Sequence, residues 1–350
     1  MTIANSINSI RNLEHPGVDK KSSLGVLKPS RRCGIFQRKP RLRLADEPLF
    51  TGAILSVIAF SYIQLFAGLS FAQSNWKLTP TKVWSGQDSG LKPLQNPSGI
   101  CSGSDGSIYI ADTGNHRVVV FDSTGRWVKE IGGLGLGSYQ FNRPSDVTAK
   151  SGLDILVADT GNDRIQRFNR RLGYISTVSN SQLFTEPTAL DVSSFGDIFI
   201  LDGDRRQVVK IDALANRIVV FGGTGSGSGE LTDPKDIAVQ GNESVWVADG
   251  TSGNVIQFDV FGNYLQQRHL GDGIEIRGIA VWDNFVWIAV GNRIGYFSDR
   301  DPLKWILQSE ELKQLQLASV DKICLNQSSL IILDSSSGKI AWFRIFPPTQ

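Results

Sequence analysis

The sequence predicts an all-β fold, a six-bladed β-propeller built from four-stranded blades. A near-duplication is the first sign: ADTGNHRVVVFD (Ala111–Asp122) returns 47 residues later as ADTGNDRIQRFN (Ala158–Asn169). Related copies follow at intervals of 42 to 47 residues, which is the length of one propeller blade. The chain also has 36 Gly among its 350 residues, which suits a fold with many tight turns.

The repeats are preceded by a basic segment and then an uncharged one. Residues 1–48 are expected to be disordered, and residues 49–72 read LFTGAILSVIAFSYIQLFAGLSFA. A basic flank, an apolar stretch and a small-x-small end predict a secretory signal peptide cleaved after Ala72. The same 24 residues are long enough to cross a bilayer as a single anchor. Both interpretations stay open, and both place residues 73–350 outside the cytoplasm, periplasmic or secreted.

Charge is divided unevenly along the chain. Residues 1–72 carry ten Lys and Arg against four Asp and Glu, whereas residues 73–350 carry 26 against 30. A mildly acidic body argues against nucleic-acid binding, which needs clustered positive charge to replace counterions. The three Cys form no CxxC motif, which excludes zinc-ribbon, RING and dithiol redox motifs.

Each repeat has the pattern of one four-stranded blade. A Pro opens an apolar strand, a second strand ends in Asp after fifteen residues, and a polar turn, an aromatic-ended third strand, a Gly turn and a fourth strand follow. The first four copies start at Pro97, Pro144, Pro187 and Pro234, and the strand-ending residues are Asp112, Asp159, Asp202 and Asp249. Degenerate copies start near Ile276, with Val290 in place of the Asp, and near Val320, where Asp334 restores it.

The last copy reaches only its third strand, Lys339–Phe346. Thr79–Ser85 resembles Gly125–Ile131, the fourth strand of the first copy. A strand from the N-terminal side would therefore complete the last blade and remove the free edges that an open ring exposes. We expect a closed ring and a monomeric protein.

The motifs resemble the NHL repeat. The resemblance rests on the Pro-x-Gly-Ile opening at Pro97, the strand end IYIAD (108–112), the triplet Asn115–Arg117 and the Gly-rich connectors 132–146 and 222–236. It covers nearly all of the NHL-type β-propeller domain, 73–350. Some NHL proteins are ubiquitin ligases through a RING domain, which is missing here. Peptide-amidating lyase relatives use a zinc ion held by channel His, and no predicted channel position is His.

The repeated Asp is interpreted as structural. Its side chain is expected to cap the turn between strands two and three, where an Asx side chain can accept backbone N–H groups. Arg117 and Arg164 lie within reach of Asp112 and Asp159, so ion pairs are expected. The remaining members of this structural set are Asp202, Asp249 and Asp334.

The residue two places after each opening Pro should line the channel mouth. These six residues are Gly99, Asp146, Ala189, Asp236, Gly278 and Lys322. Asp146 and Asp236 could hold Ca²⁺, which prefers oxygen ligands. This supports an alternative function, a metal-dependent lactonase, hydrolase or lyase. The competing interpretation needs no cofactor: Lys322 neutralises the carboxylates, or they bond neighbouring amides.

The loops on one rim carry the residues expected to bind a partner. They are His116, Tyr139, Arg143, Asp163, Arg205, Arg206, Lys235 and Arg277. Mixed polar surfaces with Arg and aromatic residues suit protein or peptide contacts. No catalytic residue is assigned, since no Gly-x-Ser-x-Gly elbow occurs. The favoured function is a non-catalytic binding or scaffold module for a protein, peptide or glycan.

Cys101 and Cys324 occupy the same slot in the first and last copies, which become neighbours when the ring closes. A disulfide there would need a Cα spacing of about 4.4–6.8 Å. Inner strands of adjacent blades are expected to lie further apart, so two buried thiols are favoured over a bridge.

Overall fold

The computed structural model describes residues 76–85, 92–152, 154–213, 217–225, 227–326 and 328–347. All of them belong to one compact unit, residues 70–350. The predicted disordered region 1–48 and the apolar segment 49–72 lie outside the described residues. Within the described part, no helix is long and apolar enough to cross a membrane.

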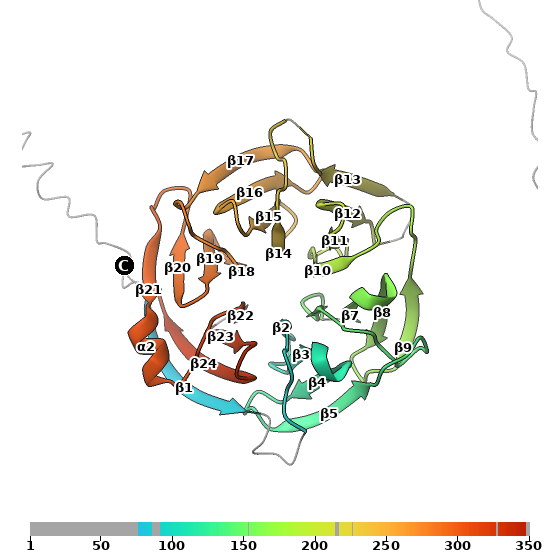
Figure 1. The fold of residues 1–350 in the computed structure, drawn as a ribbon, viewed down its shortest axis with the longest axis horizontal. Coiled ribbons are helices and arrows are strands. Elements are labelled where there is room, and N and C mark those ends of the chain that lie inside the picture. The colour runs from blue at the N-terminus through green and yellow to red at the C-terminus, as the bar shows by residue number, and fades with distance from the viewer. Residues whose placement is uncertain are drawn as a thin grey trace, which may run out of the picture. The chain divides into compact units, whose positions relative to one another are not determined.

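The described residues form six four-stranded sheets arranged around a central axis (Figure 1), which confirms the predicted propeller. Blade 1 contains β2 (Gly99–Ser102), β3 (Ile108–Asp112), β4 (Arg117–Phe121) and β5 (Trp127–Gly132). Blade 2 contains β6 (Asp146–Thr148), β7 (Asp154–Asp159), β8 (Arg164–Asn169) and β9 (Tyr174–Val178). Blade 3 contains β10 (Pro187–Val192), β11 (Ile198–Asp202), β12 (Gln207–Ile211) and β13 (Ile218–Gly222).

The second half of the ring has the same order. Blade 4 contains β14 (Pro234–Gln240), β15 (Ser244–Asp249), β16 (Asn254–Asp259) and β17 (Tyr264–His269). Blade 5 contains β18 (Gly278–Trp282), β19 (Phe285–Val290), β20 (Arg293–Phe297) and β21 (Lys304–Leu307), followed by the helix α2 (Ser309–Gln314). Blade 6 contains β22 (Lys322–Asn326), β23 (Ser329–Asp334), β24 (Lys339–Phe346) and β1 (Lys77–Ser85).

The ring closes through β1. This strand pairs antiparallel with β24, from Lys77 opposite Phe346 to Ser85 opposite Lys339, with a register shift between Pro80 and Lys82. The predicted closing strand is therefore confirmed, and it begins two residues earlier than the sequence pattern indicated.

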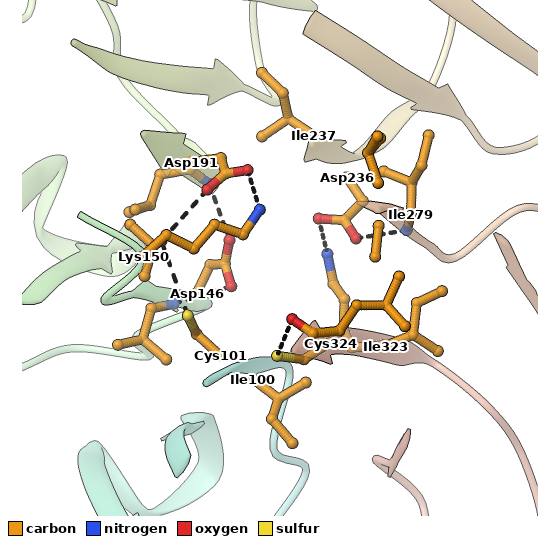
Figure 2. Close-up of a pocket in the computed structure, with 17 residues that line it drawn as sticks. Ile100, Cys101, Asp146, Lys150, Asp191, Asp236, Ile237, Ile279, Ile323 and Cys324 are labelled. Atoms are coloured by element: carbon orange, nitrogen blue, oxygen red, sulfur yellow. Dashed lines mark hydrogen bonds and ion pairs between the residues drawn. The ribbon is translucent and has the colours of Figure 1, made fainter. Parts of the chain in front are cut away.

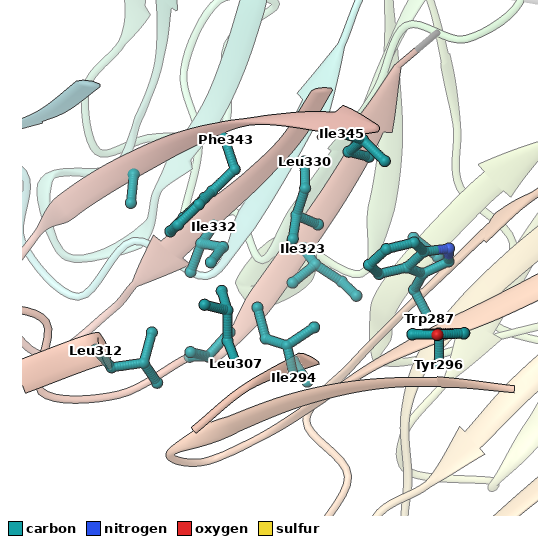
Figure 3. Packing of buried hydrophobic residues seen from close by; sticks show 14 of the residues in the cluster. Trp287, Ile294, Tyr296, Leu307, Leu312, Ile323, Leu330, Ile332, Phe343 and Ile345 are labelled. Atoms are coloured by element: carbon teal, nitrogen blue, oxygen red, sulfur yellow. The ribbon is translucent and has the colours of Figure 1, made fainter. Parts of the chain in front are cut away.

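The core consists of layers between neighbouring blades, because each sheet is covered on both faces. In β3, Ile108 and Ile110 pack toward blade 6, whereas Tyr109 and Ala111 pack toward blade 2. This explains why the inner strands are apolar at successive positions rather than at alternate ones. The layer between blades 5 and 6 also takes in Leu312 of α2 (Figure 3).

The strand-ending Asp anchors the loop that precedes its blade. Asp112 and Asp159 form the expected ion pairs with Arg117 and Arg164, at 2.6 and 2.7 Å. Their other oxygens, however, accept backbone N–H groups 17 residues upstream, from Gln95 and Asn142, at 2.7 Å in each case.

The expected turn cap is therefore wrong in blades 1 and 2, where no side-chain cap bond forms. A 3₁₀ turn, Thr113–Asn115, replaces it, and His116 in the left-handed conformation donates its N–H to the Thr113 carbonyl. The carboxylate is thus left to anchor the loop that precedes the blade. Asp334 does both, because it accepts N–H groups from Ser336 and Ser337 of its turn as well as from Ala318.

The other two members of the set also hold the preceding loop. Asp202 accepts the N–H of Glu186 at 3.3 Å and that of Arg205 in its own turn at 3.4 Å. Asp249 accepts the N–H groups of Thr232 and Asp233. The repeated residue is thus a loop anchor in all five blades that carry it.

Candidate functional site

The innermost strands surround a small central cavity. Its volume is about 50 Å³, and residues of all six blades line it (Figure 2). An apolar cavity that binds benzene has a volume of about 150 Å³, so this one is too small for an organic substrate of that size. Of the six residues expected at the channel mouth, Asp146, Asp236 and Lys322 line this cavity.

The channel carboxylates are engaged by protein groups. Asp236 pairs with Lys322 through Oδ1 at 2.6 Å and accepts the Ile279 N–H through Oδ2 at 2.9 Å. Asp146 accepts the N–H groups of Val147 and Leu190, each at 2.9 Å. The described residues contain no group of three or more His, Cys, Asp or Glu placed to hold a metal ion. The residues present therefore do not fit the Ca²⁺ site of the alternative function.

A second ion pair in the channel was not expected from the sequence. Asp191, four places after Pro187, pairs with Lys150 at 2.5 Å and accepts the Val239 N–H at 2.8 Å. The sequence does contain a signal for it. Each repeat has a second inward-facing position four residues after its opening Pro, and Asp191 occupies that position in blade 3.

Burial and neighbouring charges together set the pKa values of the channel residues. Burial raises the pKa of Asp146 to about 7; Lys322 opposes this increase and Asp236 adds to it. For Lys150, burial disfavours the charge, but the neighbouring Asp191 more than offsets it and the pKa rises.

Inner-strand side chains link each blade to the next at five junctions. In each case a side chain accepts a backbone N–H from the inner strand of the following blade, on the edge that faces the channel and lacks a strand partner. The pairs are Cys101 with Ala149, Asp146 with Leu190, Asp191 with Val239, Asp236 with Ile279, and Cys324 with Ser102. At the junction of blades 5 and 6, the corresponding slots hold Gly278 and Ala280.

Two open depressions lie side by side on the rim over blades 2 to 4. The first has a volume of about 260 Å³ and the second about 320 Å³, and Glu186 lines both. The first is lined by Arg143, Thr160, Gly161, Asp163, Thr185, Glu186 and Asp204. The second is lined by Glu186, Thr188, Gly203, Arg206, Thr232, Asp233, Pro234 and Lys235. We call these two depressions together the rim site.

The rim site brings together four of the eight predicted binding residues. Arg143 and Asp163 line the first depression, and Arg206 and Lys235 line the second. Lys235 is paired with Asp233 at 2.7 Å.

The side chains of Arg143 and Arg206, in contrast, form no hydrogen bond or ion pair with any described residue. Both arginines adopt the left-handed backbone conformation, with φ of 54° and 53°. That conformation costs a non-glycine residue about 1–2 kcal/mol. The fold thus holds both side chains at the rim on a backbone that arginine does not favour.

The other four predicted residues have structural contacts. The His116 Nδ1 accepts the Arg143 N–H at 3.0 Å, and the Tyr139 hydroxyl accepts the Tyr174 N–H at 3.0 Å. Arg205 donates to the Ser181 carbonyl at 2.7 Å. Arg277 pairs with Asp321 at 2.9 Å and Glu275 at 3.4 Å.

Sequence comparison agrees with the repeat seen in the fold. The NHL repeat pattern matches residues 94–121 and 141–168, which contain the strands and turns of blades 1 and 2 up to their third strands. The chain carries NHL repeats within a six-bladed β-propeller.

This NHL propeller is also similar to a curated protein over a short range. It is 45% identical over 49 residues to RING finger protein nhl-1 of Caenorhabditis elegans. The match covers 14% of this chain and 5% of that protein's length.

Solved structures share the propeller fold at low sequence identity. A streptogramin B lyase structure superimposes with a TM-score of 0.55 at 16% identity, covering 78% of this chain and 98% of the lyase. A catalytically inactive His-to-Ala variant of virginiamycin B lyase from Staphylococcus aureus, with quinupristin, gives 0.54 at 14% identity, covering 77% and 99%. A PQQ-bound aldose sugar dehydrogenase from Streptomyces coelicolor gives 0.52 at 12%, covering 78% and 99%. At these identities the likeness shows the fold alone.

Proposed function

We propose that this NHL propeller is a non-catalytic binding module that engages a protein or peptide through the rim site, and that it acts outside the cytoplasm. The location rests on the basic and apolar pattern of residues 1–72. A glycan is a weaker candidate, because the lining residues of the rim site include no aromatic ring on which a sugar could stack.

The two unpaired arginines carry this proposal. A guanidinium without a protein partner at a concave surface can form paired hydrogen bonds with a carboxylate of a ligand. Arginine is also enriched among the residues that dominate binding energy at interfaces. The left-handed backbone itself belongs to the repeat, since His116 and Asp163 share it at the position of Arg206, so the support comes from the unpaired guanidinium groups.

The rim site also has acidic side chains, which limit the kinds of ligand that it can bind. Asp163, Glu186 and Asp204 line the first depression beside Arg143. Complementary charge sets the register and partner choice of an interface more than its raw affinity. We therefore expect a partner segment that presents basic and acidic side chains in close succession.

Catalysis in the channel has less support. The cavity is too small for an organic substrate, and neither His116 nor His269 lines it. His269 lies on the outermost strand of blade 4, where it contacts Asn254 and Asp272. No contact among the described residues favours the lactonase or lyase alternative.

The test is partner capture by the full chain with matched variants. Chemical cross-linking in extracytoplasmic extract, followed by mass spectrometry, is compared for wild type, Arg143→Ala/Arg206→Ala and a control, Arg126→Ala/Arg171→Ala. The control arginines lie in turns between third and fourth strands, away from the rim site. Wild type and control should capture the same protein, and the rim variant should lose it. Equal capture by all three chains would contradict the proposal.

A further inference from the structure

The channel contains two thiols that the proposed binding function does not use. Cys101 lies on β2 and Cys324 on β22, so they belong to blades 1 and 6, which meet at the closure of the ring. Both are free, both are buried, and both line the central cavity (Figure 2). The preference for two buried thiols over a disulfide agrees with this structure.

Each sulfur atom accepts a backbone N–H from the following blade. The Cys324 Sγ accepts the N–H of Ser102, the residue after Cys101, at 3.0 Å. The Cys101 Sγ accepts the Ala149 N–H at 3.2 Å. The Cys324 sulfur thus lies against the backbone next to Cys101, and both thiols line one cavity at the seam.

The surroundings make the two thiols unequal. The neighbouring Cys324 thiol lowers the pKa of Cys101, burial opposes this, and Lys150 and the Ala149 N–H reinforce the decrease. The neighbouring Cys101 and burial raise the pKa of Cys324. Cys101 is thus the better nucleophile, and Cys324 keeps its proton beside it.

The cavity selects the reagents that can reach the pair. Its volume of about 50 Å³ is a third of the roughly 150 Å³ of a cavity that binds benzene. Hydrogen peroxide, with two oxygen atoms, is little larger than water, whereas glutathione disulfide and aromatic disulfides are many times larger. The geometry therefore favours a small peroxide over a bulky disulfide as oxidant.

We propose that Cys101 and Cys324 form a peroxide-reactive redox pair that becomes a reversible disulfide across the seam between blades 6 and 1. The Cys101 thiolate attacks one oxygen of hydrogen peroxide, the O–O bond breaks, and the departing hydroxide takes a proton to become water. Cys101 is then a sulfenic acid, oxidised by two electrons. Cys324 loses its proton and attacks that sulfur; the displaced hydroxide takes up a proton as a second water, and the disulfide remains.

The first experiment follows oxidation in the full chain with Cys33→Ser, which leaves Cys101 and Cys324 as its only thiols. After one equivalent of hydrogen peroxide, we expect both thiols to disappear and the mass to fall by two hydrogen atoms. Peptide mapping should find Cys101 joined to Cys324, and dithiothreitol added in denaturant should restore both thiols. Two intact thiols after a treatment that oxidises the same chain in denaturant would overturn the proposal.

Matched variants assign the two roles. After the peroxide is removed, the chains are unfolded in denaturant so that dimedone can reach every sulfur. Cys324→Ser should then carry dimedone on a Cys101 sulfenic acid, whereas Cys101→Ser should carry none. Dimedone on Cys324 but not on Cys101 would contradict the assignment. Circular dichroism confirms that each variant is folded, and the disulfide map of the Cys33→Ser chain tests the pair without either variant.

The cavity predicts selectivity by size. Oxidation by tert-butyl hydroperoxide should be at least about tenfold slower than oxidation by hydrogen peroxide in the folded Cys33→Ser chain, and the difference should shrink in denaturant. Equal rates in the folded chain would show that the thiols react outside the cavity, which contradicts the proposed site.

Discussion

Where blades 2, 3 and 4 meet the blade that follows, a channel carboxylate accepts a backbone N–H of the neighbour, whereas blade 5 meets blade 6 through packing. The carboxylates are Asp146, Asp191 and Asp236. At the packed junction, the ring of Trp76 contacts those of Trp282, Phe285 and Trp287 at centroid distances of 5.0 to 5.6 Å. This cluster is the largest of those formed by the described residues (Figure 3).

The two kinds of junction differ in whether they provide hydrogen-bond partners for buried N–H groups. The carboxylates provide acceptors for inner-strand N–H groups that have no strand partner on the channel side. The packed junction buries more apolar surface but leaves the indole N–H groups of Trp76 and Trp287 without a partner among the described residues. One solution favours hydrogen bonding and the other favours packing, and the same blade architecture accommodates both.

Removing β1 should cause the largest loss, because it breaks the packed junction and opens the ring. Deleting residues 76–85 from the full chain takes away Trp76 and the partner strand of β24. We expect the free energy of unfolding to fall by several kcal/mol out of a total of about 5–15. Denaturant unfolding measures this, with deletion of residues 11–20 as control. Unchanged stability in the first deletion would refute ring closure by β1.

Trp287→Ala tests the packed junction without changing the ring. The side chain is fully buried, so the cavity left behind should lower the free energy of unfolding by about 3–5 kcal/mol. Trp287→Phe is the matched control, since it keeps most of the packing and removes the unpaired indole N–H. Urea unfolding should show a much smaller loss for Phe. Equal losses would mean that packing does not hold this junction.

Asp146→Asn tests a carboxylate junction through pH. The pKa of Asp146 is about 7 in the folded chain against 3.8 when unperturbed, so the folded state holds a proton that the unfolded chain has released. Wild-type stability should therefore fall as pH rises from about 4 to 7, by an amount on the order of 2–4 kcal/mol. Asn keeps an acceptor for the Leu190 N–H and should flatten this part of the curve. If the free energy of unfolding of both chains changed equally with pH, Asp146 would not have the raised pKa.

The Asp112–Arg117 pair should give the smallest effect. Arg117 also binds Glu130 and the Lys92 carbonyl, so the loss of one partner is partly compensated. A double-mutant cycle with Asp112→Asn and Arg117→Gln should yield a coupling of about 1–2 kcal/mol. Unfolding by guanidinium provides the four free energies. A coupling near zero would assign the role of Asp112 to its bonds with the Gln95 N–H and the Asn115 side chain.

The sequence predicts the ring well because each blade repeats the same physical requirement. Every sheet is covered on both faces, and in five of the six blades the second strand ends at the Asp that anchors a loop. The 15-residue spacing from Pro to this Asp is therefore enough to mark four blades. Blade 5 shows why the pattern is not required everywhere. Val290 pairs directly with Arg293, and the hairpin closes through Gly291 and Asn292 without an anchoring Asp.

The partners of individual side chains were harder to predict because they depend on the path of distant loops. Arg205 and Arg206 are adjacent in sequence, yet one binds the Ser181 carbonyl and the other has no partner among the described residues. Asp112 likewise accepts the distant Gln95 N–H, and in its own turn it binds the Asn115 side chain rather than a backbone N–H. A local pattern indicates that such a residue matters but not which group it contacts.

Ring closure by β1 also has a consequence for the order of folding. Thr81 donates a hydrogen bond to the carbonyl of Trp342, 261 positions along the chain. Contacts between such distant segments form slowly, because a very long loop must close before they contribute. During synthesis, the first strand must therefore wait unpaired until the last blade has emerged, and β24 is exposed as an open edge until the two meet. The seam is thus the step at which a nascent chain is most exposed to pairing with another copy of itself.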